Sequence, residues 1–381
     1  MQINADAAGH VDDPLLGLPF DHHERYALTQ RIVSYLWPTV GRHPLRVLEV
    51  GGHSSALKYF LPDDSIVLAD IETPGTLTGL PFRFDAYFRA SGTKLPFRDA
   101  SFDLVIALDT LEHVPDEARL AFMNELVRVS SRCVILNGPT YHPATALAEQ
   151  RLARFLQRAL SWESRFLQEH LELGLPRPED IEHALSEQRV PFVTIANGNL
   201  TLWLAMNALK NYVHALPDGD QVSQALDRTY NRLLAPRDFG GLTYRTAYVI
   251  DKHDDPRALG RVQAAFAPFV DQSLVPDDSA ALEAMVTALE DHAVAFQRIV
   301  GDLKRDVEQM QAALSAKDAR LAQADTALAQ KDAHIGNIET ALHQANVQAS
   351  AAQHQINLIT GSAGYRLLEL ARRPIRWLLK Q

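Results

Sequence analysis

Four short apolar segments in the first part of the chain carry the strongest information about the fold. They are rich in Val, Leu and Ile, they lack regular polar alternation, and they lie at residues 46–50, 65–71, 102–108 and 133–136. Such runs are typical of strands that are buried on both faces, as in a parallel sheet. Stretches with helical periodicity, such as residues 116–129, lie between them. We therefore expect an α/β fold with a doubly wound sheet.

The next hundred residues are mainly helical and end with two more candidate strands. A helical pattern over 146–173, in one helix or two, stops before Pro176 and Pro178, because proline cannot continue a helix. Residues 190–196 and 243–250 have the composition of strands, and 200–214 that of a helix. These two strands would complete a seven-stranded sheet. We predict one domain over 1–255, with a core at 40–145 and a helical cover plus the last strands at 146–255.

After a linker predicted at 256–281, a seven-residue repeat predicts a long α-helical coiled coil over 282–358. Its first seam is apolar at every position: Val300, Val307, Leu314, Leu321, Leu328, Ile335 and Leu342. The second seam is only partly apolar, because Lys317 and Lys331 interrupt it, and such residues can set the register or the strand number. We expect a homo-oligomer through this segment. A single long helix packed on the domain is the alternative.

The last stretch, residues 361–381, combines five basic residues and one acid with several leucines and Trp377. A basic amphipathic segment of this kind can lie on an anionic membrane surface. A terminal helix docked on protein, or a disordered tail, is the alternative for this stretch.

Composition and targeting signals narrow the class of protein. The chain is 46% apolar and 22% charged, which is ordinary for a soluble protein, and its net charge of −10 lacks the electrostatic footprint of a nucleic-acid binder. We find no secretory leader and no apolar run long enough to span a membrane. The single cysteine, Cys133, fits a buried residue in a reducing compartment. We expect a cytoplasmic protein, peripheral at the inner face of the cell membrane where the tail binds lipid.

Two of the apolar segments end in residues suited to binding a nucleoside. Gly51 and Gly52 follow the first segment, where adjacent glycines allow a tight turn and close approach of a ligand to the backbone. Asp70 lies nineteen residues beyond Gly51, and a carboxylate at this spacing can accept both hydroxyls of a ribose. Because ligands of open α/β sheets bind at the carboxyl ends of the strands, these residues predict a nucleoside site there.

The stretch from 95 to 116 carries a family resemblance. It reads LPFRDASFD at 95–103 and LEHVPD at 111–116, on either side of the third apolar segment. With VLEVGG at 47–52 and LADI at 68–71, it closely resembles the class I S-adenosylmethionine-dependent methyltransferases of the small-molecule type. The resemblance covers about residues 45–140. It implies a seven-stranded Rossmann-like methyltransferase sheet and S-adenosylmethionine as cofactor.

The resemblance also implies roles for residues near the first two strands. Gly51 and Gly52 would pass close to the methionine part of the cofactor, and Glu49 would anchor the loop or bind the amine. Asp70 would bind the ribose hydroxyls, with Ile71 against the adenine. Glu49 could instead cap the following helix.

Further implied positions include two departures from the family pattern. Asp109 would line the methionine moiety and the transferred methyl, or else cap the helix that follows it. Ser91 stands where the family often has an acid for the adenine amine. His53 and Ser55 stand where the family usually repeats glycine, which narrows the turn.

Catalysis of methyl transfer depends largely on holding the acceptor in line with the methyl group, and an oxygen acceptor must also lose a proton. Histidine suits proton removal near neutral pH. The candidates are His113, His142 and His170. Residues 22–26 open the first helix and are candidates to close over the cofactor, or form a solvated helix start.

No metal-ligand set is evident in the sequence. His22 and His23 are adjacent and so cannot share one helical face. We find no HExxH motif and no cysteine pair, and also no P-loop and no GxSxG. We predict no metal site.

The tail suggests the biological setting. A methyltransferase domain followed by a coiled coil and an ending such as YRLLELARRPIRW resembles bacterial enzymes of cell-surface polysaccharide assembly. This implies O-methylation of a sugar hydroxyl on a glycan or sugar nucleotide, in O-antigen-like biosynthesis, beside glycan-assembly proteins. One alternative is a small-molecule methyltransferase that acts on a quinone, lipid or secondary metabolite. The other is an inactive scaffold, which His53 and Ser55 favour.

Overall fold

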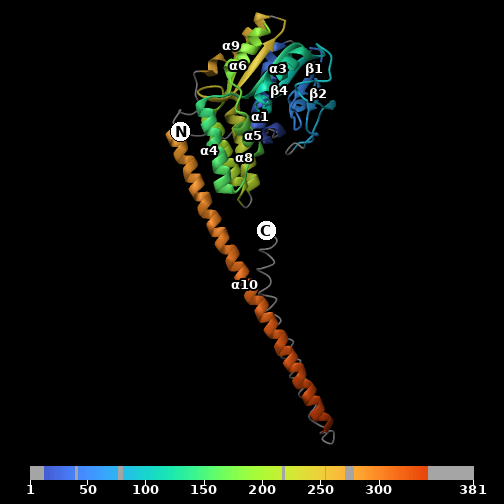
Figure 1. The fold of residues 1–381 in the computed structure, drawn as a ribbon, viewed down its shortest axis with the longest axis vertical. Coiled ribbons are helices and arrows are strands. Elements are labelled where there is room, and N and C mark those ends of the chain that lie inside the picture. The colour runs from blue at the N-terminus through green and yellow to red at the C-terminus, as the bar shows by residue number, and fades with distance from the viewer. Residues whose placement is uncertain are drawn as a thin grey trace, which may run out of the picture. The chain divides into compact units, whose positions relative to one another are not determined.

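The computed structural model describes residues 13–38, 42–75, 80–216, 219–253, 255–270 and 279–341. The chain divides into two units, residues 1–298 and 299–381. The first unit contains a seven-stranded sheet with helices on both of its faces (Figure 1). The second unit, in its described part, belongs to one long helix.

The sheet has the strand order β3-β2-β1-β4-β5-β7-β6. The strands are β1 (Arg46–Val50), β2 (Ser65–Asp70), β3 (Ala86–Arg89), β4 (Phe102–Leu108), β5 (Ser130–Pro139), β6 (Phe192–Asn199) and β7 (Thr243–Asp251). All neighbours are parallel except that β7 runs antiparallel to both β5 and β6. The order reverses between β1 and β4, which is the switch point where ligands of such sheets bind. The predicted doubly wound α/β, Rossmann-like fold is confirmed.

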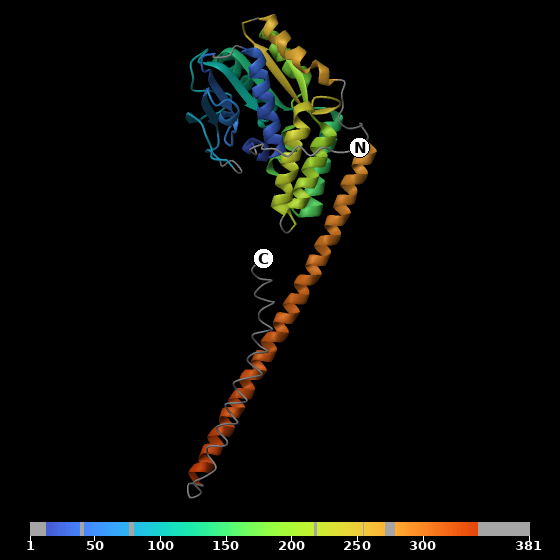
Figure 2. The ribbon, with the colours of Figure 1, turned by 180° about the vertical axis from the view of Figure 1, so that it is seen from behind.

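Both faces of the central strands are buried, as their continuous apolar composition predicts. In β4, Leu104 and Ile106 join one apolar cluster while Val105 and Ala107 join another. The first cluster is completed by α1 (Phe20–Leu36), α2 (Leu57–Phe60) and α9 (Pro256–Val270), and the second by α3 (Asp116–Val129) and α6 (Pro178–Glu187). Figure 2 shows α1, in blue, lying across one face of the sheet. Each fully buried Val, Leu or Ile contributes about 1.5–3 kcal/mol to folding.

A third apolar cluster joins the helices that cover the carboxyl ends of the strands. It contains residues of α4 (Pro143–Leu160), α5 (Arg165–Leu173), α7 (Leu200–His214) and α8 (Gly219–Leu233). Figure 1 shows α4, α5 and α8 gathered below the sheet. The helical stretch predicted at 146–173 is two helices, because Ser161 adopts a left-handed conformation (φ 52°) that ends α4. Short 3₁₀ turns occur at Pro14–Gly17, Leu111–His113 and Ala235–Arg237.

The expected linker at 256–281 begins with a folded helix. Residues 256–270 form α9, and its Ala258, Leu259, Val262 and Phe266 are buried in the first cluster. These positions recur at the spacing of one helical face. The folded domain therefore continues past the predicted boundary at 255.

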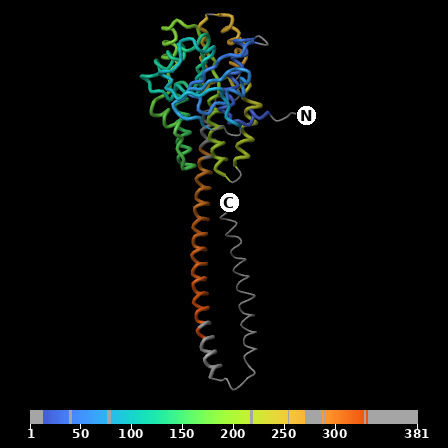
Figure 3. The backbone as a smooth tube through the Cα atoms, turned by 90° about the vertical axis from the view of Figure 1, so that its right-hand side faces the viewer, coloured from blue at the N-terminus to red at the C-terminus, as the bar shows by residue number. Residues whose placement is uncertain are grey.

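The helix α10 (Ser279–Ala341) runs without a break for 63 residues, which corresponds to about 95 Å (Figure 3). Leu303, Met310 and Leu321 of the heptad seams are 58%, 58% and 51% exposed. The helical part of the coiled-coil prediction agrees with this element, whereas 342–358 and the tail at 361–381 lie outside the described residues. Among the described helices, none is long and apolar enough to cross a membrane.

Candidate active site

A cavity of about 660 Å³ lies at the carboxyl ends of β1 and β4, at the switch point of the sheet. The loops after these two strands form one side of it, and the start of α1 with side chains from α4, α5 and α7 form the other. Its volume is in the range of ordinary small-molecule sites. The cavity therefore occupies the place that the sequence predicts for a ligand.

The two glycines after β1 are required by the geometry of the loop. Gly51 has a φ of +84°, and a Cβ at this position would lie 2.3 Å from the Thr110 Oγ1. A Cβ on Gly52 would lie 3.0 Å from the Glu49 Cγ. Both residues line the cavity. The loop therefore needs glycine at both positions and presents its backbone to the cavity.

Glu49 braces this loop from below and is not among the lining residues of the cavity. It is 2% exposed and accepts hydrogen bonds from the Tyr26 hydroxyl, at 2.9 Å, and from the Ser55 Oγ. Burial raises the pKa of Glu49. The Ser55 Oγ in turn accepts a bond from the Leu57 amide. Ser55, a departure from the family pattern, therefore ties the carboxylate to the start of α2.

Asp70 links the loop after β1 to the end of β2. Its Oδ2 accepts a bond from the His53 amide at 3.0 Å, and its Oδ1 accepts one from the Glu72 amide at 2.9 Å. Burial alone would raise the pKa of Asp70, but the bonds from His53 and the backbone outweigh it and lower the pKa. The His53 Nδ1 lies 3.7 Å from the same Oδ2. The carboxylate is therefore ionised and faces the histidine.

Ile71 and Ser91 lie close to Asp70 along the chain and along the sheet edge. Ile71 follows β2 and is 63% exposed. Ser91 lies just after β3, the neighbour of β2, and its Oγ is 2.8 Å from the Thr93 Oγ1. Asp70, Ile71 and Ser91 all lie outside the set that lines the cavity.

Asp109 is held by two arginines from distant parts of the chain. Arg245 of β7 donates to both of its carboxylate oxygens, at 2.8 and 2.7 Å, and Arg25 of α1 donates to Oδ2 at 2.8 Å. Burial would raise the pKa of Asp109, but the two arginine charges hold it well below its usual range. Asp109 lines the cavity, with a φ of +45°. The helix-cap alternative is wrong, because the carboxylate binds arginines.

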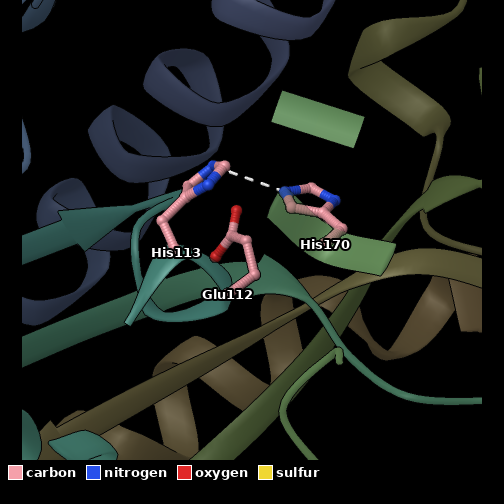
Figure 4. Close-up of side chains that lie close together, drawn as sticks. All are labelled: Glu112, His113 and His170. Atoms are coloured by element: carbon pink, nitrogen blue, oxygen red, sulfur yellow. Dashed lines mark hydrogen bonds between the residues drawn. The ribbon is translucent and has the colours of Figure 1, made fainter. Parts of the chain in front are cut away.

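Glu112, His113 and His170 meet at the wall of the cavity (Figure 4). The Nε2 atoms of the two histidines lie 3.3 Å apart. Glu112 is 1% exposed, and neither of its carboxylate oxygens has a hydrogen-bond partner among the described residues. Burial, followed by the charge of Asp109, raises the pKa of Glu112 to about 8. The structure thus brings two predicted histidines to one point, with a glutamate that the sequence analysis overlooked.

The outer nitrogens of both histidines face carboxylates. The His170 Nδ1 lies 2.8 Å from the Glu149 Oε1, which also accepts a bond from the Tyr244 hydroxyl at 2.7 Å. The His113 Nδ1 lies 2.8 Å from the Glu169 Oε2. Burial opposes the charged form of His170, but Glu149 and Glu112 outweigh it and raise its pKa, whereas burial lowers the pKa of His113.

His142, the third candidate base, is separated from this group. It is exposed, caps α4 by accepting a bond from the Ala144 amide at 3.2 Å, and is not among the lining residues of the cavity. The prediction of His142 as a base is thus not supported by its position. At the start of α1, in contrast, His22, Arg25 and Tyr26 line the cavity, which agrees with the expectation that residues 22–26 lie next to a bound ligand.

The absence of a metal site stays a prediction, but the structure brings together one group of possible metal ligands. One ligand atom from each of Glu112, His113 and His170 lies within 4.8 Å of the others. The sequence conceals this group because α5 is folded back onto the turn at Leu111–His113 from more than fifty residues away. Arg245 escaped notice for the same reason, since β7 carries no motif.

The comparisons with known proteins agree with the family resemblance over part of the chain. Residues 69–132 match the family model described as a methyltransferase domain. An uncharacterized methyltransferase of Mycobacterium sp. (strain JLS) is 54% identical over 44 residues, which are 12% of this chain and 17% of that protein. The match therefore spans less than a fifth of the relative's own length.

Two solved structures are similar to the chain at low identity. The YcgJ protein of Bacillus subtilis is 12% identical, with a TM-score of 0.35, over 60% of this chain and 97% of that chain. Magnesium protoporphyrin IX methyltransferase from Synechocystis PCC 6803 with bound SAH is 14% identical, with a TM-score of 0.35, over 65% and 90%. The part of the chain that matches the family model, residues 69–132, includes Asp70, Asp109 and Glu112.

Proposed function

We propose that the protein is an S-adenosylmethionine-dependent methyltransferase. The observation that carries the proposal is the bare glycine loop at the switch point, with an ionised carboxylate at the end of the neighbouring strand. A side chain on Gly51 or Gly52 would collide with Thr110 or Glu49, so glycine at both positions keeps the loop in the conformation that lines the cavity. The match to a methyltransferase domain over 69–132 supports the same assignment.

The residues present fit this cofactor. Asp70 is suited to hold the ribose hydroxyls, Ile71 to pack on the adenine, and the backbone at Gly51–Gly52 to lie along the methionine part. Bound there, S-adenosylmethionine supplies a methyl group on a sulfonium, which an acceptor displaces to leave S-adenosylhomocysteine. Asp109 is already saturated by Arg25 and Arg245, so its part is to fix the wall of the cavity.

We propose a sugar hydroxyl of a cell-surface glycan or sugar nucleotide as the acceptor. Trp162 and Phe166, which are 48% and 52% exposed, line the cavity, as do the amides of Asn207 and Asn211. Aromatic rings pack against the apolar faces of a sugar, and amides bond to its hydroxyls. The Phe166 ring also packs edge-on against His113, at 5.5 Å between centroids. The acceptor would thus lie beside the paired histidines.

Calorimetry of the full chain with S-adenosylmethionine and S-adenosylhomocysteine tests the proposal. Asp70→Ala should weaken binding by about 1–3 kcal/mol through the loss of charged hydrogen bonds. Asp63→Ala, at an exposed position before the same strand, is the matched control and should bind normally. If neither ligand produced heat, the result would contradict the proposal and favour the alternative of an inactive scaffold. A screen of acceptors with a labelled methyl donor separates a sugar from a quinone, lipid or secondary metabolite.

We further propose that α10 joins copies of this chain, with glycan-assembly proteins as further partners and the tail as a membrane contact. The support is the row of exposed apolar residues on an uninterrupted helix. Light scattering of residues 282–358 should report an oligomer, and a monomer at high concentration would reject the coiled coil. Binding to anionic liposomes should fall when residues 361–381 are removed.

A further inference from the structure

The arrangement of Glu112, His113 and His170 concentrates hydrogen-bond acceptors in a buried space. The Glu149 carboxylate can only accept, so the His170 Nδ1 must carry a proton. The Glu169 carboxylate, 2.8 Å from the His113 Nδ1, favours a proton there as well. The two Nε2 atoms lie 3.3 Å apart and share a hydrogen bond, so a metal ion bound to both would replace the proton that one of them donates.

Glu112 adds two more acceptors to this space. Neither of its oxygens has a hydrogen-bond partner among the described residues, although the side chain is 1% exposed. A buried carboxylate without a partner is costly unless a cation or proton compensates it. One possible ligand atom from each of the three residues lies within 4.8 Å of the others, so that a positive ion can bind here in place of the protons they hold.

We propose that Glu112, His113 and His170 bind a divalent transition-metal ion through one carboxylate oxygen and the two Nε2 atoms. Two imidazoles and one carboxylate are typical ligands of Zn²⁺, Fe²⁺ and Mn²⁺. The bond between the His170 Nδ1 and Glu149 is of the kind that orients histidine ligands in metal sites and raises their basicity, and the Glu169 carboxylate lies 2.8 Å from the His113 Nδ1. The Tyr244 hydroxyl, bonded to Glu149, extends this support.

The role of the ion rests on the proposed function. All three residues line the cavity, so an ion that they held would lie within reach of an acceptor. The ion would lower the pKa of an acceptor hydroxyl, which would release its proton to water. The oxygen would then bond to the methyl carbon as the carbon–sulfur bond broke, with the electron pair staying on sulfur. Two neighbouring hydroxyls of a sugar would fill two coordination positions of the ion.

Metal binding by itself is the test, measured without methyl donor or acceptor. After chelator treatment and dialysis, the full chain is titrated with ZnCl₂ or MnCl₂ in a calorimeter. We expect one ion per chain, and a loss of affinity of about 100-fold or more in His113→Ala and Glu112→Gln. Glu149→Gln, which weakens the support of His170 and also the bond from Tyr244, should lower affinity by about 10–100-fold.

Matched controls keep the test decisive. Glu117→Gln, on the exposed side of α3, and His183→Ala, which is 74% exposed on α6, should bind the ion like the natural chain. Circular dichroism verifies that each variant is folded, and His113 is a mild substitution because it is 23% exposed. Absence of binding by the folded natural chain, or equal binding by His113→Ala and Glu112→Gln, would overturn the proposal. Metal binding without methyl transfer would leave the site standing and refute only the proposed function.

Discussion

The two ends of the candidate active site are built in different ways. The cofactor end is local. Asp70 accepts bonds from the amide of Glu72, two residues further on, and from the amide of His53, in the loop after the neighbouring strand β1. Gly51 lies against Thr110, which follows the adjoining strand β4. The acceptor end draws Arg25, Glu112, His170 and Arg245 from segments far apart in the chain. Motifs report the first kind of construction, whereas only the folded structure reports the second.

The largest effect should come from the arginine pair at Asp109, which joins distant segments of the acceptor end. Asp109→Asn breaks the ion pairs with Arg25 and with Arg245, which is 2% exposed and keeps a contact with Glu24 at 3.3 Å, and we expect a loss of about 3 kcal/mol in the free energy of unfolding. Because folding lowers the pKa of Asp109, its contribution is present above the unfolded pKa and is lost as pH falls through the folded pKa. Urea unfolding measures both effects. The control Asp63→Asn should leave the free energy of unfolding nearly unchanged. An equally small loss in Asp109→Asn would show that the ion pairs of Asp109 do not stabilise the fold.

A smaller effect is expected from Gly51→Ala at the cofactor end. The positive φ and the contact with Thr110 strain any side chain, at a cost of about 1–3 kcal/mol, and a shift of the loop away from Thr110 would disturb the cavity that Gly51 lines. Thermal unfolding and calorimetry with S-adenosylhomocysteine report the two consequences. Gly260→Ala is the control and should raise stability slightly. A Cβ at this position meets no atom within 4 Å, and alanine favours the helix α9 more than glycine does. If the two variants were equally stable, the claim that the loop requires glycine at position 51 would be wrong.

The smallest effect should come from Trp162→Ala and should separate the two ends. The side chain is 48% exposed at the cavity, so we expect little change in stability, unchanged cofactor affinity and a KM for the acceptor raised about 5–10-fold, or roughly 1 kcal/mol. Steady-state kinetics with a labelled methyl donor measure it. Tyr141→Ala, 37% exposed and outside the cavity lining, serves as control. If only the affinity for the cofactor changed, Trp162 would belong to the cofactor end of the site and not to the acceptor end.

The same contrast explains how much the sequence could predict. Continuous apolar runs predicted β1 and β4 residue by residue, since both faces of these strands are buried. The apolar residues of 256–270 have the spacing of a helical face, but the domain boundary predicted at 255 placed them in the linker. Glu112 lies inside a recognised motif, yet its importance depends on His170, which only the folding of α5 brings to it. His142 satisfied the rule for position after a strand but serves as a helix cap.

The central claim is that the loop at Gly51–Gly52 and the carboxylate of Asp70 together hold the cofactor. A crystal structure of the full chain with S-adenosylhomocysteine tests it most directly. We predict that the ribose hydroxyls bond to Asp70, that His53 moves off this carboxylate, and that the sulfur lies toward His113. A nucleoside bound elsewhere, with the imidazole of His53 still beside Asp70, would contradict the account.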